Sequence, residues 1–226
     1  MSKTISIAID GPAGAGKSTI AKQLAKELGY YYVDTGAIYR TVAYFMDLLG
    51  VSAKDADGVQ RYIDELTIHI EYDEEGAQHM IMNGMDVTDD IRTPDISRMA
   101  SDISAHAVVR SVLLDMQRDV AKKHNVIMDG RDIGTVVLPR ANVKIFLTAS
   151  PEVRATRRHA ELVAKGSKDS YEKVLSDIKK RDHNDSTRQI APLKQAKDAI
   201  LVDTSHMEIE EALATIKAIV AEKVGL

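Results

Sequence analysis

The sequence has no cysteine and no tryptophan, and aromatic residues are scarce (Tyr 8, Phe 2). The absence of cysteine excludes disulfides, thiolate metal ligands and a cysteine nucleophile. So few aromatic side chains provide little surface on which nucleic-acid bases stack. Lysine and arginine number 30 against 34 aspartate and glutamate, and the formal net charge of −4 gives no general field for a polyanion. These absences argue against binding of nucleic acid.

Long hydrophobic runs are also missing. The apolar runs are the length of strands, and none approaches the roughly 20 residues that span a membrane. An alternating apolar segment at 5–9 begins almost at the first residue, which leaves no room for a signal peptide. We therefore predict a cytoplasmic protein with no membrane partner, and the length of 226 residues suits one α/β unit with insertions.

Segments typical of strands alternate with segments typical of helices. A strand leads into a glycine-rich turn and then a helix over 17–28, whose apolar residues recur every four positions. Helical periodicity is also expected over 37–49, 94–123 and 209–224. Strands are expected at 5–9, 30–33, 126–128, 143–147 and 199–202. This order predicts an α/β fold in which a five-stranded parallel sheet is flanked by helices.

Two segments depart from this alternation. Residues 66–90 alternate in hydropathy and contain Asn83-Gly84, a strong hairpin signal, so they predict a small antiparallel sheet inserted into the α/β body. Residues 152–184 are highly charged and helical, with a break at Gly166-Ser167. A charged helical pair with a glycine between its halves is typical of a mobile lid.

Residues 11–18, GPAGAGKS, match the phosphate-loop pattern G-x-x-x-x-G-K-[ST]. Its backbone N–H groups surround the β-phosphate, Lys17 supplies a charge to the β and γ oxygens, and the Ser18 hydroxyl suits Mg²⁺. The guanine-reading segment N-K-x-D of GTP-binding switches is absent, so a small-molecule kinase is favoured. The residues expected to bind ATP are Gly11, Pro12, Ala13, Gly14, Ala15, Gly16, Lys17, Ser18 and Thr19.

Polar residues follow two of the predicted strands. Asp34 and Thr35 come after the second strand, where open α/β sheets bind ligands, and Arg40 lies one helical turn further on. The alternative is a helix N-cap with Arg40 on the solvated face. After the third strand, Asp129 is placed to hold Mg²⁺ through water and Arg131 to clamp a phosphate, the alternative being a polar turn.

Basic residues crowd the predicted lid and its exit: Arg154, Arg157, Arg158, Lys179, Lys180, Arg181 and Arg188. For most of them a solvated face is the expected role. Arg181, Asp185 and Arg188 differ, because their spacing places them on one face of a continuing helix. Kinases also need arginines that reach the transferring phosphoryl group, so part of this set is a candidate for catalysis.

Seven motifs occur in the order seen in bacterial cytidylate kinases: IDGPAGAGKST, VDTGAIYR, IRTPDIS, MDGRDIGTVV, VKIFLTAS, RRHAELVAKG and RDHNDSTRQIAPL. The chain thus resembles this family of P-loop nucleoside monophosphate kinases from Ile9 to about Asp203. The resemblance implies an adenylate-kinase-like core at 1–35, 105–150 and 189–226, an NMP-binding domain at 36–104 that carries the insert, and a lid at 151–188. Thr35 stands where many members have serine, and Ser18 where some have glycine.

The resemblance also implies roles for individual residues. Ser101, Arg110 and Asp132 would read cytosine, Arg40 with Arg131 and Arg188 would hold the CMP phosphate, and Arg181 with Asp185 would contact the sugar. The residues expected to bind CMP are Asp34, Thr35, Arg40, Ser101, Arg110, Arg131, Asp132, Arg181, Asp185 and Arg188. The residues expected in catalysis are Lys17, Arg131, Arg188 and one or both of Arg157 and Arg158, and those expected at the metal are Ser18 and Asp129.

The implied activity is transfer of phosphate from ATP, with Mg²⁺, to CMP and dCMP by a monomer. The nearest alternative is a P-loop kinase for another acceptor, such as UMP, AMP or a small alcohol, in which the cytosine-reading set has no task. A nucleotide-binding regulatory protein would hydrolyse ATP slowly without an acceptor. A nucleic-acid repair or remodelling protein needs a basic surface that the net charge does not support.

Overall fold

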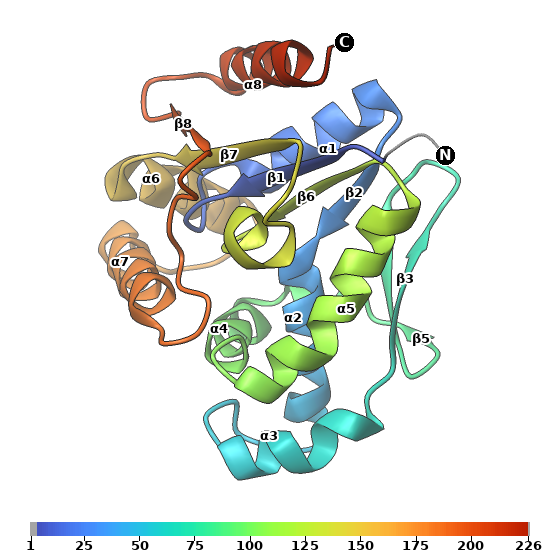
Figure 1. Cartoon of the computed structure of the whole chain (residues 1–226). Coiled ribbons are helices and arrows are strands. Elements are labelled where there is room, and N and C mark those ends of the chain that lie inside the picture. The colour runs from blue at the N-terminus through green and yellow to red at the C-terminus, as the bar shows by residue number, and fades with distance from the viewer. Residues whose placement is uncertain (1–3, 226) are drawn as a thin grey trace.

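The computed structural model describes residues 4–225 and contains a five-stranded parallel sheet in the order β2-β6-β1-β7-β8 (Figure 1). Its strands are β1 (Ser6–Asp10), β2 (Tyr31–Asp34), β6 (Val126–Gly130), β7 (Val143–Thr148) and β8 (Ile200–Asp203). Each of the five coincides with a predicted strand, with ends that differ by at most two residues. The α/β class with a five-stranded parallel sheet is therefore confirmed.

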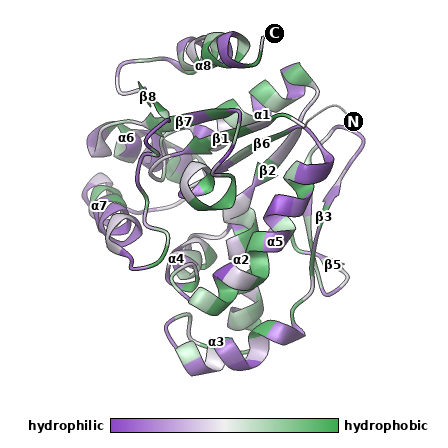
Figure 2. Ribbon diagram, in the orientation of Figure 1, coloured by the Kyte–Doolittle hydropathy of each residue, from purple (hydrophilic) through white to green (hydrophobic). Residues whose placement is uncertain are grey.

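Helices cover both faces of this sheet. Helices α1 (Lys17–Leu28) and α8 (Ile209–Val224) lie above it in Figure 1, and α2 (Thr35–Leu48) and α5 (Ala107–Lys123) lie below. Successive side chains of β1 point to opposite faces, so Ile7 and Ile9 join the core under α1 and α8, whereas Ala8 joins the core against α2 and α5. Figure 2 shows polar and apolar residues mixed along each long helix, as expected for helices that bury one side.

The insert is the antiparallel sheet that the sequence predicts, in the order β3-β4-β5. Its strands are β3 (Ile68–Tyr72), β4 (Gln78–Met82) and β5 (Met85–Asp86), preceded by the unpredicted helix α3 (Ala56–Tyr62). The Tyr72 hydroxyl donates to the backbone oxygen of Tyr32 (2.9 Å), and the backbone N–H of Asp34 donates to the side chain of Gln78 (2.7 Å). Side chains of the insert thus satisfy the backbone of β2, which is an edge strand.

The helical periodicity over 94–123 belongs to two helices, α4 (Pro94–Ile103) and α5. The Thr93 side chain accepts from the backbone of Ile96 and caps α4, and Pro94 occupies its first turn. A third helical segment, the short π-helical turn Ile133–Val137 after β6, was not predicted.

The charged segment forms α6 (Pro151–Ala164) and α7 (Tyr171–Thr187), as the break at Gly166 predicts. Each helix is capped by a serine, Ser150 or Ser170. Ala155, Val174 and Ile178 form a small core between the two helices, separate from the cores of the main sheet. Across residues 4–225, no helix is both long enough and apolar enough to cross a membrane.

Candidate active site

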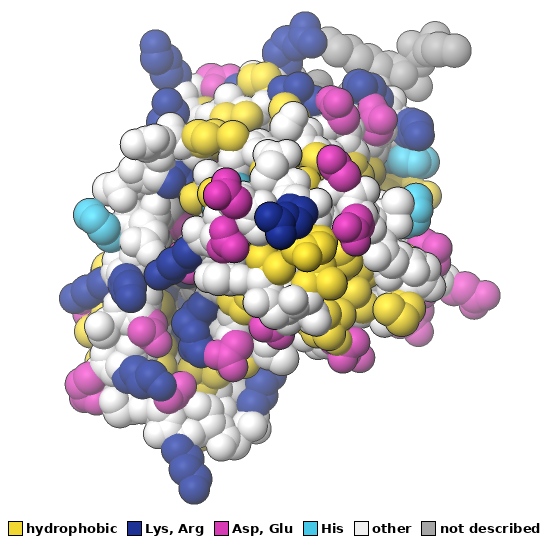
Figure 3. Space-filling view, turned by 90° about the horizontal axis from the view of Figure 1, so that it is seen from below, with side chains coloured by type: hydrophobic (Ala, Val, Ile, Leu, Met, Phe, Trp, Pro, Cys, Tyr) yellow, Lys and Arg dark blue, Asp and Glu magenta, His cyan; other side chains and the backbone are white. Residues whose placement is uncertain are grey.

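A cleft of about 590 Å³ opens beyond the carboxyl ends of the parallel strands. Every predicted site residue except Gly11 and Pro12 lines it. Its lining includes eight lysines and arginines but six aspartates and glutamates, so the cleft is cationic in a chain of net charge −4. Figure 3 shows Lys and Arg side chains gathered on the α7 side of the molecule. A positively lined cleft of this size suits a phosphorylated small molecule.

The phosphate loop connects β1 to α1. A Cβ on Gly11 would lie 1.9 Å from the backbone oxygen of Leu147, so only glycine fits where the loop passes β7. Lys17, the first residue of α1, is buried and donates to the backbone oxygen of Pro12 (2.8 Å). Burial, aided by the nearby charge of Arg131, lowers the pKa of Lys17 to about 7. This amine is thus held in the loop, where phosphate oxygens would stabilise its charged form.

Asp129, the second-last residue of β6, faces the start of α1. One of its carboxylate oxygens accepts from the Ser18 hydroxyl (3.0 Å) and the other from the buried Tyr32 hydroxyl (2.9 Å). Burial, followed by the charge of Asp34, raises the pKa of Asp129 to about 6. Two hard oxygen donors beside a phosphate loop match Mg²⁺, which takes one or two protein ligands and fills its remaining positions with water and phosphate.

Within residues 4–225 no group of three or more histidine, aspartate and glutamate side chains is arranged to hold a metal by itself.

Asp34 and Arg40 lie together on one wall of the cleft. The alternatives left open by the sequence both apply to Asp34, because one oxygen accepts from the backbone of Ala37 (2.9 Å) and caps α2, while the other pairs with Arg40 (2.9 Å). The alternative of a solvated Arg40 does not hold, since its side chain is 18% exposed. Its Nε is buried without a partner in the described residues. Thr35 is also buried and donates to the backbone oxygen of Asp129 (2.7 Å).

A second cluster lies where α5, the end of β6 and the end of α7 meet. The Asp132 carboxylate pairs with Arg110 through one oxygen and with Arg188 through the other (3.3 Å). Arg188 also donates to the Ser104 hydroxyl (2.9 Å), and the Arg110 guanidinium lies 5.6 Å from the ring centre of Tyr39. These contacts hold an arginine and a carboxylate, both buried, side by side at the cleft wall.

A third cluster is built on α7. Arg131 donates to Asp185 (2.8 Å), whose other oxygen accepts from the Ser101 hydroxyl (3.2 Å). Arg181 lies on the same face of the helix, and its Nε is buried without a partner in residues 4–225. Burial, with the charge of Arg131 next, lowers the pKa of Arg181 to about 10. The face predicted from the spacing of these residues does point into the cleft.

The two arginines of the predicted lid, both on α6, differ in their contacts. Arg157 donates to the hydroxyl of Thr204 (3.2 Å) and to the backbone oxygen of Thr204 (2.8 Å). It also donates, at a longer distance, to the backbone oxygen of Met207 (3.4 Å). Among residues 4–225, Arg158 pairs only with Glu161 on its own helix (2.9 Å), and its side chain is 36% exposed. Arg157 is thus held by the chain after β8, whereas Arg158 is held only by a surface pair, which is worth little.

Arg154 corrects the expectation of a solvated basic face. It is 3% exposed, donates to the phosphate-loop backbone at Ala13 (3.1 Å) and forms a bidentate pair with Asp182 (3.0 and 2.6 Å). It therefore connects α6 and α7 to the phosphate loop. Lys179 and Lys180 are exposed, as expected for a solvated face.

Sequence reasoning missed several residues of the cleft. Tyr39 and Ser104 support the Asp132 cluster, and the segment 204–212 lines the cleft beside Arg157. That segment follows β8, so its position after a predicted strand of the parallel sheet was the available signal. No local sequence pattern indicates that Ser104 belongs to the cleft.

A phosphate loop that opens onto a cleft lined with arginines defines a P-loop kinase, because phosphoryl transfer depends on cations around the γ oxygens. The family model described as cytidylate kinase matches residues 7–222. The chain belongs to the cytidylate kinase family.

Curated relatives agree with this assignment. The chain is 51% identical to the cytidylate kinase of Carboxydothermus hydrogenoformans over 96% of this chain and 97% of the relative. It is 50% identical to that of Caldicellulosiruptor bescii over 95% and 94%. Among solved structures, an uncharacterised protein from Eubacterium ventriosum shares the fold, with a TM-score of 0.50 and 15% identity over 96% of this chain and 99% of that one.

Proposed function

We propose that this protein transfers the γ-phosphate of ATP to CMP and dCMP. The observation that carries the proposal is the buried Arg110–Asp132 pair, which lines the same cleft as the phosphate loop. The edge of cytosine presents acceptors at O2 and N3 and a donor at the N4 amine. A guanidinium donates to the acceptors, and a carboxylate accepts from the amine. Uracil has a carbonyl at C4 and a proton on N3, so the same pair would face it with mismatched groups.

The acceptor phosphate would be held by Arg40, Arg131 and Arg188. The Nε of Arg40, which has no partner in residues 4–225, supports this, because a buried donor without an acceptor costs free energy that a phosphate oxygen relieves. The same holds for Arg181, which with Asp185 would contact the ribose. A sugar contact through these two residues does not depend on the 2′-hydroxyl alone. Because CMP and dCMP differ only in that hydroxyl, both would be bound.

The ATP phosphates would occupy the loop 11–19, with the charged form of Lys17 on the β and γ oxygens. Ser18 and, through water, Asp129 would hold Mg²⁺, which neutralises charge on the β- and γ-phosphates when bound. The adenine ring would lie between Arg157 and the segment 204–212, the part of the cleft where Arg157 is held by backbone oxygens.

Transfer forms a bond between a CMP phosphate oxygen and the γ-phosphorus and breaks the bond to the β–γ bridging oxygen, which leaves with its electron pair on ADP. The acceptor oxygen is already anionic at neutral pH, so no general base is required. Positioning and neutralisation of charge supply the rate enhancement. Arg158, which among the described residues is held only by its surface pair with Glu161, would be the lid arginine that turns toward the transferring group. Closure of the lid would exclude water, the competing acceptor.

The test is ADP release from Mg·ATP by the purified protein, with CMP, dCMP, UMP, AMP, GMP or no acceptor in parallel. We expect fast turnover with CMP and dCMP and slow turnover with UMP. Equal rates with UMP would keep the kinase but refute cytosine reading by Arg110 and Asp132. ADP release that is independent of an acceptor would instead favour a regulatory ATPase. The division into core, NMP-binding domain and lid, the cytoplasmic location and the monomeric state stay predictions.

A further inference from the structure

The turn at Ile133–Val137 follows directly after Asp132, and its position determines where the Asp132 side chain lies. It is wound more widely than an α-helix: the backbone oxygen of Asp132 accepts from Val136 (2.8 Å) and Val137 (3.2 Å), and that of Ile133 accepts from Leu138 (2.7 Å). Because the backbone of Asp132 is itself part of this hydrogen bonding, a shift of the turn moves the Asp132 carboxylate relative to Arg110 and Arg188.

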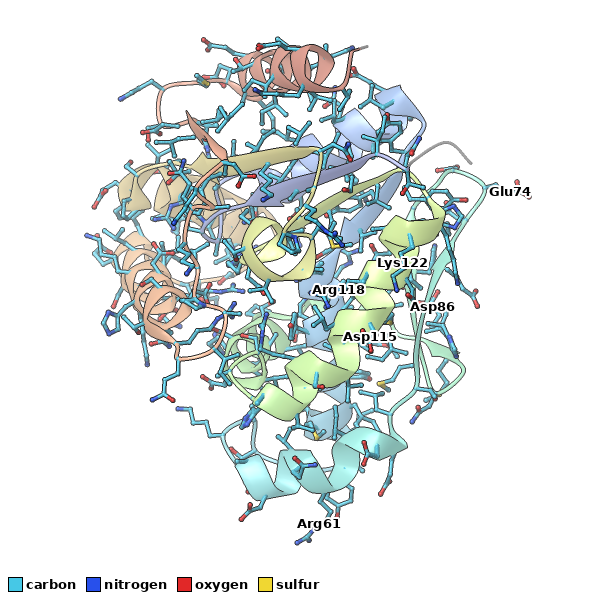
Figure 4. The ribbon with its side chains drawn as sticks, in the orientation of Figure 1. Arg61, Glu74, Asp86, Asp115, Arg118 and Lys122 are labelled. Atoms are coloured by element: carbon cyan, nitrogen blue, oxygen red, sulfur yellow. The ribbon has the colours of Figure 1, made fainter. Side chains whose placement is uncertain are left out.

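Two charged side chains hold the two ends of the turn. The Asp10 carboxylate accepts from the backbone N–H groups of Ile133 and Gly134, each at 2.7 Å. At the other end, Arg118 donates to the backbone oxygens of Val136 (2.9 Å) and Val137 (3.0 Å). Arg118 lies on α5 beside this turn (Figure 4). The end groups of a short helical turn have no partners inside it, and here both ends are satisfied from outside.

Asp10 joins this turn to the phosphate loop. It is the last residue of β1, pairs in register with Gly130 of β6, and is followed directly by Gly11. The Asp10 side chain therefore connects the strand that leads into the ATP cradle with the turn that follows Asp132, across 123 residues of sequence.

The side chain at position 10 must supply two hydrogen-bond acceptors, one for the N–H of Ile133 and one for that of Gly134. Two adjacent N–H groups point at the Asp10 carboxylate, whose two oxygens both accept. An asparagine has one acceptor oxygen and an NH₂ group that would face a backbone N–H. Asp10 is 4% exposed, and burial raises its pKa to about 6 against the opposing effect of the two N–H groups. The chain keeps a buried carboxylate here although its burial is unfavourable, and no arginine or lysine forms an ion pair with it in residues 4–225 within 4.0 Å.

We propose that Asp10 and Arg118 are positioning residues for base recognition, which fix the 133–137 turn so that Asp132 meets the base of the acceptor nucleotide. This inference rests on the proposed function for the identity of the base. It extends that function to two residues outside the cleft lining, and it connects acceptor recognition to the strand that bears the phosphate loop.

The test compares Asp10→Asn with wild type by titration calorimetry and steady-state kinetics for CMP and for ATP. Loss of one of the two hydrogen bonds, with a donor facing a donor, is expected to raise the Kd and KM for CMP about tenfold. ATP binding and kcat at saturating CMP should stay within about threefold, and the preference for CMP over UMP should fall. Asp55→Asn is the matched control, because Asp55 also accepts from a backbone N–H but caps α3.

A double variant separates positioning from general structural damage. In an Asp132→Asn background, Asp10→Asn should raise the CMP Kd less than twofold further, since its route to the base is already removed. Equal weakening of CMP and ATP binding, or additive effects in the double variant, would overturn the inference.

Arg118→Met carries the test if Asp10→Asn melts below the assay temperature, because it frees the other end of the same turn. An unchanged Kd for CMP in this variant would also overturn the inference. If wild type prefers another nucleoside monophosphate, the proposed substrate is wrong, and the same comparison with the preferred acceptor against ATP still decides the role of the turn.

Discussion

Asp132→Asn tests base recognition most directly, because Asp132 combines full burial with two ion pairs. It is 4% exposed and pairs with Arg110 and Arg188. Removal of one partner from a buried ion pair costs about 3–5 kcal/mol, and asparagine keeps one acceptor, so we expect a loss of about 3 kcal/mol. For a chain of this length, each kcal/mol lowers Tm by about 2–4 °C, which predicts a fall of about 6–12 °C.

The effect on substrate use is expected to be selective. A hydrogen bond to a charged group contributes about 1.5–3 kcal/mol, so loss of the carboxylate should raise the KM for CMP about 10- to 100-fold. The KM for ATP should stay close to wild type, because in residues 4–225 the Asp132 carboxylate contacts Arg110 and Arg188 and no residue of the phosphate loop. CMP should also protect the variant less than wild type against thermal unfolding, since stabilisation by a ligand follows its affinity.

Thermal melts with and without CMP, and initial rates with CMP, UMP and ATP varied separately at 20 °C or below, measure both effects. Asp198→Asn is the matched control: it breaks the pair with the buried Lys144 outside the cleft (2.8 Å) and should leave both KM values unchanged. A CMP KM within twofold of wild type would refute base reading by Asp132. Equal rises for CMP and ATP would mean that Asp132 only supports the fold.

Three further predictions concern the phosphate end of the cleft. Lys17→Met should lower kcat by about 10²–10³ while the circular dichroism spectrum and Tm stay near wild type, and near-normal turnover would contradict the assignment of the loop. Because burial lowers the pKa of Lys17 to about 7 and phosphates favour the ammonium form, ATP binding at pH 8 should take up close to one proton and weaken from pH 7 to pH 9. Calorimetry in buffers of different ionisation enthalpy measures this uptake, which Lys17→Met should abolish. Arg158→Ala should lower kcat with little change in KM, whereas Arg157→Ala should raise the KM for ATP, and the reverse pattern would exchange their roles.

Local signals in the sequence were enough for the main elements of the fold. Helix α1 begins and ends at the residues predicted, because its apolar residues recur every four positions and Gly29 takes a left-handed conformation at its end (φ 66°). The phosphate loop was found for the same reason: its chemistry is carried by consecutive residues. The insert followed from strict alternation and from Asn83, which adopts a positive φ of 48° in its hairpin.

The amino-acid sequence alone left open which charged side chains would contact one another. Asp34 was ambiguous because capping and ion pairing use different oxygens of one carboxylate, and the structure uses both. Arg154 looked like its exposed neighbours, but packing of α6 against α7 and the phosphate loop buries it. Helical spacing indicates a shared face, and what covers that face is set by non-local packing.

Asp10 shows the same limit most clearly. In the sequence it is one polar residue at the end of an apolar strand, and its partners lie 123 and 124 residues further along the chain. The parallel order β2-β6-β1-β7-β8 brings the carboxyl ends of these strands to one edge, and the cleft is formed there. Periodicity and turn chemistry thus specify the strands, the long helices and the ATP loop, but not α3 or the 133–137 turn. The acceptor side depends on side chains that become neighbours only when the sheet assembles, because burial and charge pairing act between distant segments.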